Sequence, residues 1–122
     1  MKARLQVSEF KAETRFRDGV AVIELHGDVN GDAERGLDAA SHEAEAYNPT
    51  TIVLNFKEVG YINSTGIALI VGVLARARKD RRTIVACGLS DHYQEIFTIT
   101  RLSDFMRMFP DEESAVADTP AA

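Results

Sequence analysis

The chain has 122 residues, of which 45% are hydrophobic and 27% charged, and its formal net charge is −5. This length and composition predict one compact domain with its own core and exclude a disordered chain. The acidic balance, with a pI near 5.1, argues against a protein that binds the phosphate backbone of nucleic acid. The longest unbroken apolar run, 67–75, has about half the length that a membrane span needs, so no membrane insertion is expected.

Two strands joined by a tight turn are predicted at the start of the chain. Leu5 and Val7 alternate with polar residues, which is typical of a half-buried strand. Asp18-Gly19, a favoured two-residue turn, leads into the β-branched segment 20–25. These strands should form a hairpin. The first residues carry charges and no apolar stretch, so they do not predict a secretion signal.

Helices and strands are then expected to alternate. The periodicity of the apolar residues predicts the following order: helix 33–47, strand 51–56, helix from 63 or 64 to about 79, strand 83–87, short helix from Ser90, strand 104–109 and helix to about 117. The strand 51–56 is apolar on both faces, as a strand covered on two sides would be. One domain over 1–117 and a short flexible tail over 118–122 are expected.

This alternation predicts an α/β fold. Strands separated by helices of this length imply right-handed crossovers between parallel neighbours. We therefore expect a sandwich with a mostly parallel sheet of about four or five strands, an N-terminal hairpin, and helices packed mainly on one side.

Common catalytic and cofactor motifs are absent from the sequence, which contains no GxGxxG, GxxxxGK[ST], GxSxG or HExxH pattern. His26, His42 and His92 fall in three different elements with no ligand spacing, so we expect surface or boundary positions for them. Cys87 lies in an apolar strand, where a free thiol fills space, and a lone cysteine fits a reducing, cytoplasmic setting. No catalytic residue, metal or cofactor is predicted.

A basic stretch over 76–82 contains four arginines and one lysine. One interpretation is a helix end followed by an exposed turn, because cations complement the carbonyl end of the helix dipole. The alternative is a surface that grips an acidic partner. Both interpretations remain open at the level of the sequence.

Two adjacent hydroxyl residues, Ser64 and Thr65, lie at the start of the helix predicted over 64–79. Either Asn63 or Ser64 can cap this helix, and Gly66 permits a close approach of the backbone. A helix N-terminus presents free amides and partial positive charge, so it also suits a phosphoryl group, which would bring about −1.5 to −2 charges. A hydrolase with Ser64 as nucleophile would need an oriented base, and no local motif supplies one.

The segment 51–116 resembles the body of a STAS domain of the anti-sigma factor antagonist kind, and the resemblance extends over about residues 10–117. Its most specific parts are the stretches YINSTGIALI, GLSDHYQEIFTITRL and FPDEESAV. The family's GxLD box is represented by Gly27-Asp28-Val29-Asn30. The resemblance implies the STAS-type sandwich and a regulatory protein without enzymatic activity that works by switching partners.

The resemblance implies a cycle of phosphorylation. In this family the unmodified antagonist binds an anti-sigma factor, which is usually a serine kinase of the GHKL ATPase type, and this binding frees a sigma factor. The kinase inactivates the antagonist by phosphorylating the serine of a D-S-[ST]-G sequence, and a PP2C-type phosphatase restores it. Ser64 matches this serine, and Thr65 is the secondary candidate. The expected partner-binding patch combines the loops 28–30 and 61–66 with the start of the following helix and comprises Asp28, Asn30, Tyr61, Asn63, Ser64, Thr65, Gly66 and Ile67.

Two positions depart from the family pattern, since Asn30 and Asn63 stand where aspartates are common. Replacing each carboxylate removes a repulsion of about 1 kcal/mol toward a nearby phosphate, so a phosphorylated state would be easier to tolerate. If a kinase or its magnesium ion must contact those carboxylates, however, phosphorylation would be slower or absent. The alternative function is a STAS scaffold or ligand-sensing domain that is not phosphorylated and assembles with other subunits.

Overall fold

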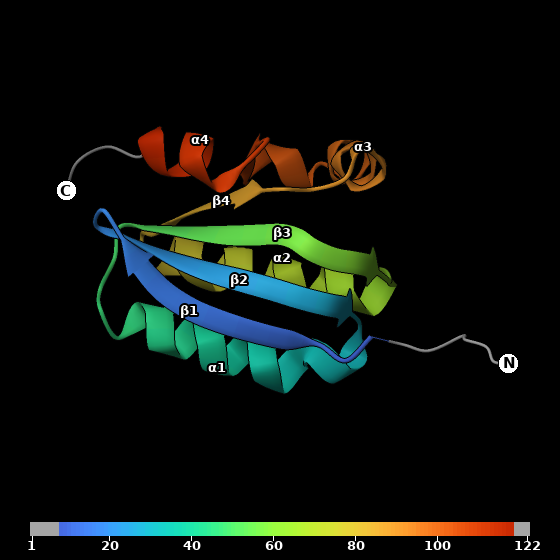
Figure 1. Ribbon diagram of the computed structural model, residues 1–122, viewed down its shortest axis with the longest axis horizontal. Helices are drawn as coiled ribbons and strands as arrows, with labels where there is room; N and C mark the ends of the chain where they lie inside the picture. Colours follow the sequence, from blue (N-terminus) through green and yellow to red (C-terminus); the bar gives the residue numbers. More distant parts are fainter. Residues whose placement is uncertain (1–7, 119–122) are drawn as a thin grey trace, which may run out of the picture.

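Within the described residues, the sheet has five strands that lie side by side in the order of the chain, β1-β2-β3-β4-β5. The computed structural model describes residues 8–118 (Figure 1). Its strands are β1 (Lys11–Arg17), β2 (Val20–Val29), β3 (Thr51–Ile62), β4 (Thr83–Cys87) and β5 (Arg107–Phe109). Its helices are α1 (Glu34–Glu45), α2 (Ser64–Lys79), α3 (Asp91–Ile99) and α4 (Glu112–Ala117), with short 3₁₀ helices η1 (Gly31–Ala33) and η2 (Leu102–Asp104).

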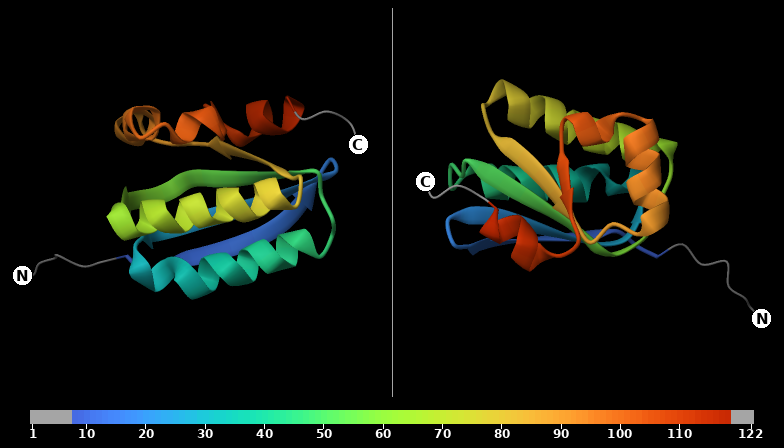
Figure 2. Two further views of the ribbon diagram at one scale, coloured as in Figure 1. Left: turned by 180° about the vertical axis from the view of Figure 1, so that it is seen from behind. Right: turned by 90° about the horizontal axis from the view of Figure 1, so that it is seen from above.

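The topology follows from right-handed crossovers. β1 pairs with β2 in antiparallel fashion through the Asp18-Gly19 turn, and every other neighbouring pair is parallel. Each crossover advances to the next strand in the same direction, so α1, α2 and α3 all pack on one face of the sheet. The chain leaves β5 toward the opposite face, where α4 lies (Figure 2). The predicted α/β fold, with its hairpin, its mostly parallel sheet and its helices mainly on one side, is confirmed.

The core has two unequal parts, one on each face of the sheet. The larger part lies under α1, α2 and α3 and includes Leu37, Ile70 and Phe97. The smaller part lies under α4 and includes Val53 and Cys87. β3 contributes to both parts, because alternate side chains of a strand point to opposite faces. The expectation of a strand covered on both sides is therefore confirmed for β3.

β2 and β3 are longer than the sequence pattern predicts. The pattern predicts strands over 20–25 and 51–56, but β2 continues to Val29 and β3 to Ile62. Two shifts of register, between Glu24 and His26 and again between Gly27 and Asp28, keep the strands paired where their polar residues break the apolar pattern. Most of the two predicted loops, 28–30 and 61–66, is thus strand or helix.

The last strand, β5, is shorter than the sequence pattern predicts. Only the second half of the predicted strand 104–109 is a strand: Arg107–Phe109 pairs with β4, whereas Asp104 ends the 3₁₀ turn Leu102–Asp104 and Phe105 is its C-cap. Phe105 is consequently 61% exposed. The predicted strand residues Leu5 and Val7 lie outside the described residues.

The helix predicted over 33–47 ends earlier than expected, whereas α4 ends at Ala117 as predicted. This helix, α1, ends at Glu45, and Tyr47 is 67% exposed, with the centroid of its ring 3.8 Å from that of Phe16. The predicted tail, 118–122, falls outside the described residues except for Asp118, which is the C-cap residue of α4 and forms a 2.6 Å ion pair with Arg107.

Candidate functional site

The carboxyl ends of β2 and β3 meet the start of α2 at one edge of the sheet. Asp28 is the register partner of Tyr61, and Val29 that of Ile62. The Asn63 amide then donates a 3.1 Å hydrogen bond to the carbonyl of Val29, so the pairing continues up to the residue before α2. Asn63 alone connects β3 to the helix. We call this region, which comprises residues 28–33 and 61–67, the mouth of α2.

Asn63 is the N-cap of α2. Its side-chain oxygen accepts a 2.8 Å hydrogen bond from the amide of Gly66, and its carbonyl accepts one of 2.9 Å from the amide of Ile67. The choice that the sequence left open, between Asn63 and Ser64, is thereby settled. Ser64 is the first helical residue, its side chain is not needed as the cap, and both Ser64 and Thr65 are exposed. Both residues therefore lie at the surface of the first turn.

Gly66 is required by the close approach of β2 to the helix. A β-carbon at this position would collide with the carbonyl oxygen of Val29 and would lie 2.7 Å from its carbonyl carbon. At neighbouring Gly31, a β-carbon would lie 3.6 Å from Cγ2 of Thr65. η1 is therefore packed beside the first turn of α2, and the segment that follows β2 forms one side of the mouth.

The first turn of α2 carries no acidic side chain, although Asp28 of β2 and Asp32 of η1 lie in the mouth beside it. The first turns of α1, α3 and α4 each contain at least one acidic residue, whereas the first turn of α2 contains none. Asn30 caps η1, with its side-chain oxygen accepting a 2.9 Å hydrogen bond from the amide of Asp32. The half-buried carboxylate of Asp28 accepts one of 3.3 Å from the amide of Ser8. The positive end of the α2 dipole thus has no acidic side chain in its own first turn.

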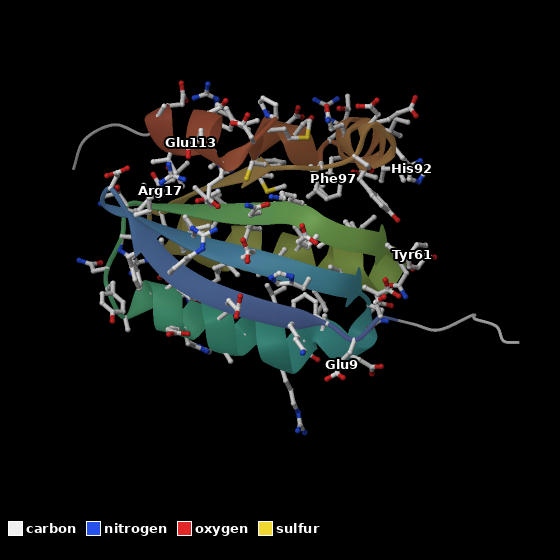
Figure 3. The ribbon with its side chains drawn as sticks, viewed as in Figure 1. Glu9, Arg17, Tyr61, His92, Phe97 and Glu113 are labelled. Atoms are coloured by element: carbon white, nitrogen blue, oxygen red, sulfur yellow. The ribbon has the colours of Figure 1, made fainter. Side chains whose placement is uncertain are left out.

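Tyr93, a buried residue of α3, fixes the end of β3. Its hydroxyl accepts a 2.9 Å hydrogen bond from the amide of Ile62 and lies 3.4 Å from the carbonyl oxygen of the same residue. Phe97, one turn further along α3, packs edge-on against Phe56 with 5.9 Å between ring centroids. Figure 3 shows Phe97 between α3 and the sheet. A buried tyrosine needs a partner for its hydroxyl, and this rule is the signal that points to Tyr93.

The structure brings the predicted partner-binding residues together. Tyr61 is 54% exposed at the end of β3 (Figure 3). Asp28 lies beside it, Asn30 follows as the N-cap of η1, and Ile67 is half-buried against the core at the rim of the mouth. Gly66 is buried and contributes only its backbone. The result is one accessible surface formed by β2, β3, η1 and α2.

Other side chains that could bind a metal ion or act as a nucleophile lie outside the mouth of α2. Glu13, Glu24 and His26 form a group within residues 8–118 whose potential ligand atoms lie within 4.8 Å of one another. Hydrogen bonding to Arg15 lowers the pKa of Glu24, so this carboxylate already has a cationic partner. Burial raises the pKa of Cys87 to about 12, which makes its thiol a poor nucleophile. His42 and His92 are exposed and His26 is half-buried.

Comparison with known proteins identifies the fold family. A family model of the STAS domain matches residues 11–115, which is most of the chain. The chain belongs to the STAS domain family. The STAS domain is also 35% identical to an anti-sigma-B factor antagonist of Staphylococcus aureus, over 79% of this chain and 89% of that protein.

Solved structures agree on the fold of this STAS domain. An anti-sigma factor antagonist from Mycobacterium paratuberculosis superposes with a TM-score of 0.77 at 16% identity and covers 89% of this chain and 92% of its own. The phosphorylated form of SpoIIAA, a cell fate determinant of Bacillus, superposes with a TM-score of 0.66 at 23% identity and covers 89% and 97%. In the described part of this STAS domain, no helix has the length and apolar character needed to cross a membrane.

Proposed function

We propose that this STAS domain is an anti-sigma factor antagonist that is switched off by phosphorylation of Ser64. In the unmodified state the mouth of α2 binds an anti-sigma factor that is a serine kinase of the GHKL type, in the cytoplasm, and a PP2C-type phosphatase reverses the modification. The domain itself has no catalytic role. The observation that carries the proposal is the exposure of Ser64 at a helix N-terminus whose cap is provided by a different residue.

The geometry of the helix start explains why phosphorylation would act on binding and not on folding. A phosphoryl group on Ser64 lies near the free amides of the first turn, where the helix dipole stabilises an anion by about 0.3–1 kcal/mol. The Asn63 cap stays intact because it does not use the Ser64 hydroxyl. The modified protein should therefore keep its fold and present about two negative charges on the surface that its partner contacts.

The two asparagines that replace the family's usual aspartates affect this proposal in a specific way. Asn63 keeps the capping hydrogen bond, and Asn30 caps η1, so neither replacement disturbs the local structure. Compared with an aspartate, each neutral amide lowers the electrostatic repulsion toward a phosphate on Ser64 by about 1 kcal/mol. We therefore propose that the phosphorylated state is well tolerated. An Asn63→Asp variant tests whether the kinase needs a carboxylate at this position, since it should then be phosphorylated faster.

The first experiment is phosphorylation in vitro. The purified protein is incubated with ATP and each serine kinase of the GHKL type from the source genome, and the modified residue is mapped by mass spectrometry. We expect a single phosphate on Ser64, which is lost in Ser64→Ala and retained in Thr65→Ala. Phosphate on Thr65 alone would move the switch to the secondary candidate.

The second experiment measures binding. Ser64→Asp should weaken the affinity for the cognate kinase at least tenfold, whereas Ser64→Ala should bind as the unaltered protein does. Equal affinity of the Asp variant, together with a lack of phosphorylation by every kinase tested, would contradict the switch. Native mass spectrometry that then finds a large homomeric or mixed assembly would favour the unphosphorylated scaffold.

A further inference from the structure

A second recognition surface lies at the opposite end of α2. A cavity of about 760 Å³ opens between the C-terminal half of α2, the start of β4 and the segment that follows α3. Figure 2 shows this segment lying beside α2. None of the residues that form the mouth of α2 lines the cavity. A ligand bound here would therefore leave Ser64 free.

The wall of the cavity is largely apolar. Leu74 of α2, Ile84 of β4 and Leu102 of η2 are buried beneath it. Val71 and Phe105, which also line it, remain 46% and 61% exposed. Ligand sites of small molecules are concave, mostly apolar hollows of about 300–1,000 Å³ with a few polar groups, and this cavity falls within that range.

Cationic side chains surround the apolar wall. The lining includes four arginines, Arg78, Arg81, Arg82 and Arg101, and a single carboxylate, Asp104. Arg101 is bound to Asp104 at 2.8 Å, and the guanidinium of Arg78 lies 5.5 Å from the centre of the Phe105 ring. Arg101 is paired with Asp104 and Arg82 donates a 2.6 Å hydrogen bond to the Pro49 carbonyl, yet the lining keeps a net positive charge, which favours an anionic ligand in a chain with a net charge of −5.

Two of these arginines occupy backbone positions that favour glycine. Arg81 follows the C-cap of α2 with φ +60°, and Arg101 follows the C-cap of α3 with φ +67°. The other non-glycine residues with positive φ within residues 8–118 are Asp18 and Asn48, whose types tolerate it more readily. Helices usually end in this conformation with glycine. A cation can complement the dipole of a helix end from a neighbouring residue with negative φ, so the dipole alone does not explain an arginine at positive φ. We therefore expect the side chains of Arg81 and Arg101 to have a further function.

We propose that this cavity binds a small amphiphile with an apolar body and an anionic head group. The apolar body packs against Leu74, Ile84 and Leu102, and the head group lies between the guanidinium groups of Arg81 and Arg101. Carboxylate and phosphate oxygens both match the planar fork of arginine, so both head groups share the recognition chemistry. The basic stretch 76–82 of the sequence supplies three of the four arginines. Its role is thus ligand recognition as well as the ending of α2.

Four amphiphiles whose alkyl chains have eleven or twelve carbons test the charge of the ligand. Laurate, dodecyl phosphate, dodecyl maltoside and dodecyltrimethylammonium are titrated below their critical micelle concentrations into ¹⁵N-labelled full-length protein. We expect the two anions to bind and to shift the amides of 71–84 and 100–105, and the stronger of the two identifies the head group. Equal binding of all four, binding of neither anion, or shifts centred on 61–67 would overturn the proposal.

An arginine variant separates recognition from stability. Arg81→Gly should weaken binding of the preferred anion about tenfold, because one charge-assisted contact is lost. It should also raise the Tm by about 4 °C, because glycine relieves the positive φ. Asn48→Gly relieves the same kind of strain outside the cavity, and Arg35→Gln removes an exposed charge from α1. Both controls should retain the affinity. Unchanged affinity in Arg81→Gly would overturn the proposal.

Discussion

Two glycines of α2 test how closely the helix approaches the sheet. Gly66→Ala should destabilise the protein by about 2 kcal/mol, because a β-carbon there collides with the Val29 carbonyl and the backbone must move. Gly72→Ala is the matched control on the same helix. A β-carbon at Gly72 meets nothing within 4 Å, so alanine should stabilise the protein by about 1 kcal/mol through its helix propensity. Urea denaturation measures both changes, and a stabilising Gly66→Ala would refute the close approach.

At the scale of residues, sequence reasoning finds groups whose chemistry is local. Ser64 and Asn63 could be placed at a helix start because N-cap preferences depend on a few neighbouring residues. Tyr93 could not be placed, because its partner at Ile62 is 31 positions away and depends on how α3 packs on β3. The same limit applies to Asn55, a buried amide in an apolar strand, whose partner in α4 is 57 positions away.

At the scale of elements, the N-cap of α2 separates structure from regulation. Asn63→Ala should cost about 1 kcal/mol of stability, because the Gly66 amide loses its hydrogen bond. Ser64→Ala should change the stability by less than about 0.5 kcal/mol, since the exposed hydroxyl does not cap the helix. Thermal unfolding of the two variants compares them directly. If Ser64→Ala cost as much as Asn63→Ala, its use as an inert control for phosphorylation would fail.

The elements whose apolar period is unbroken were predicted well, and those set by long-range pairing were not. α2 and β4 lie where the pattern places them, within one residue at each end. β2 and β3 run several residues beyond the predicted ends, because each polar extension is held by its neighbour and by the register shifts between them. β5 is shorter than predicted, since the 3₁₀ turn Leu102–Asp104 and its C-cap Phe105 occupy the predicted start of the strand.

At the scale of the whole molecule, one charged cluster joins the first described strand to the last helix. Glu112 of α4 accepts hydrogen bonds from Arg15 and Arg17 of β1, at 2.6–2.9 Å, and from buried Asn55 of β3, at 3.0 Å. Arg17 also pairs with Glu113, and Figure 3 shows these two residues at the end of the molecule away from Tyr61. The cluster holds α4 over the smaller core. The sequence offered only a weak signal for it, the arginines at alternate positions of a strand.

This cluster predicts how stability depends on pH. The hydrogen bond from Arg15 is the largest cause that lowers the pKa of Glu112 from 4.5 to about 2. Because the pKa is lower in the folded state than in the unfolded state, the stabilisation is complete above about pH 4.5 and is lost as the pH falls through about 2. Allowing for the partial exposure of both arginines, the contribution is on the order of 2 kcal/mol.

Glu112→Gln should therefore destabilise the protein at pH 6 and have progressively less effect toward pH 2.5. Urea denaturation at a series of pH values, with the unaltered protein measured in parallel, gives this difference directly. Glu113→Gln is the matched control, because the neighbouring carboxylate is 78% exposed and its loss should matter little at any of these pH values. A Glu112→Gln effect of the same size at pH 6 and pH 2.5 would show that the negative charge of Glu112 does not stabilise the packing of α4 on the sheet.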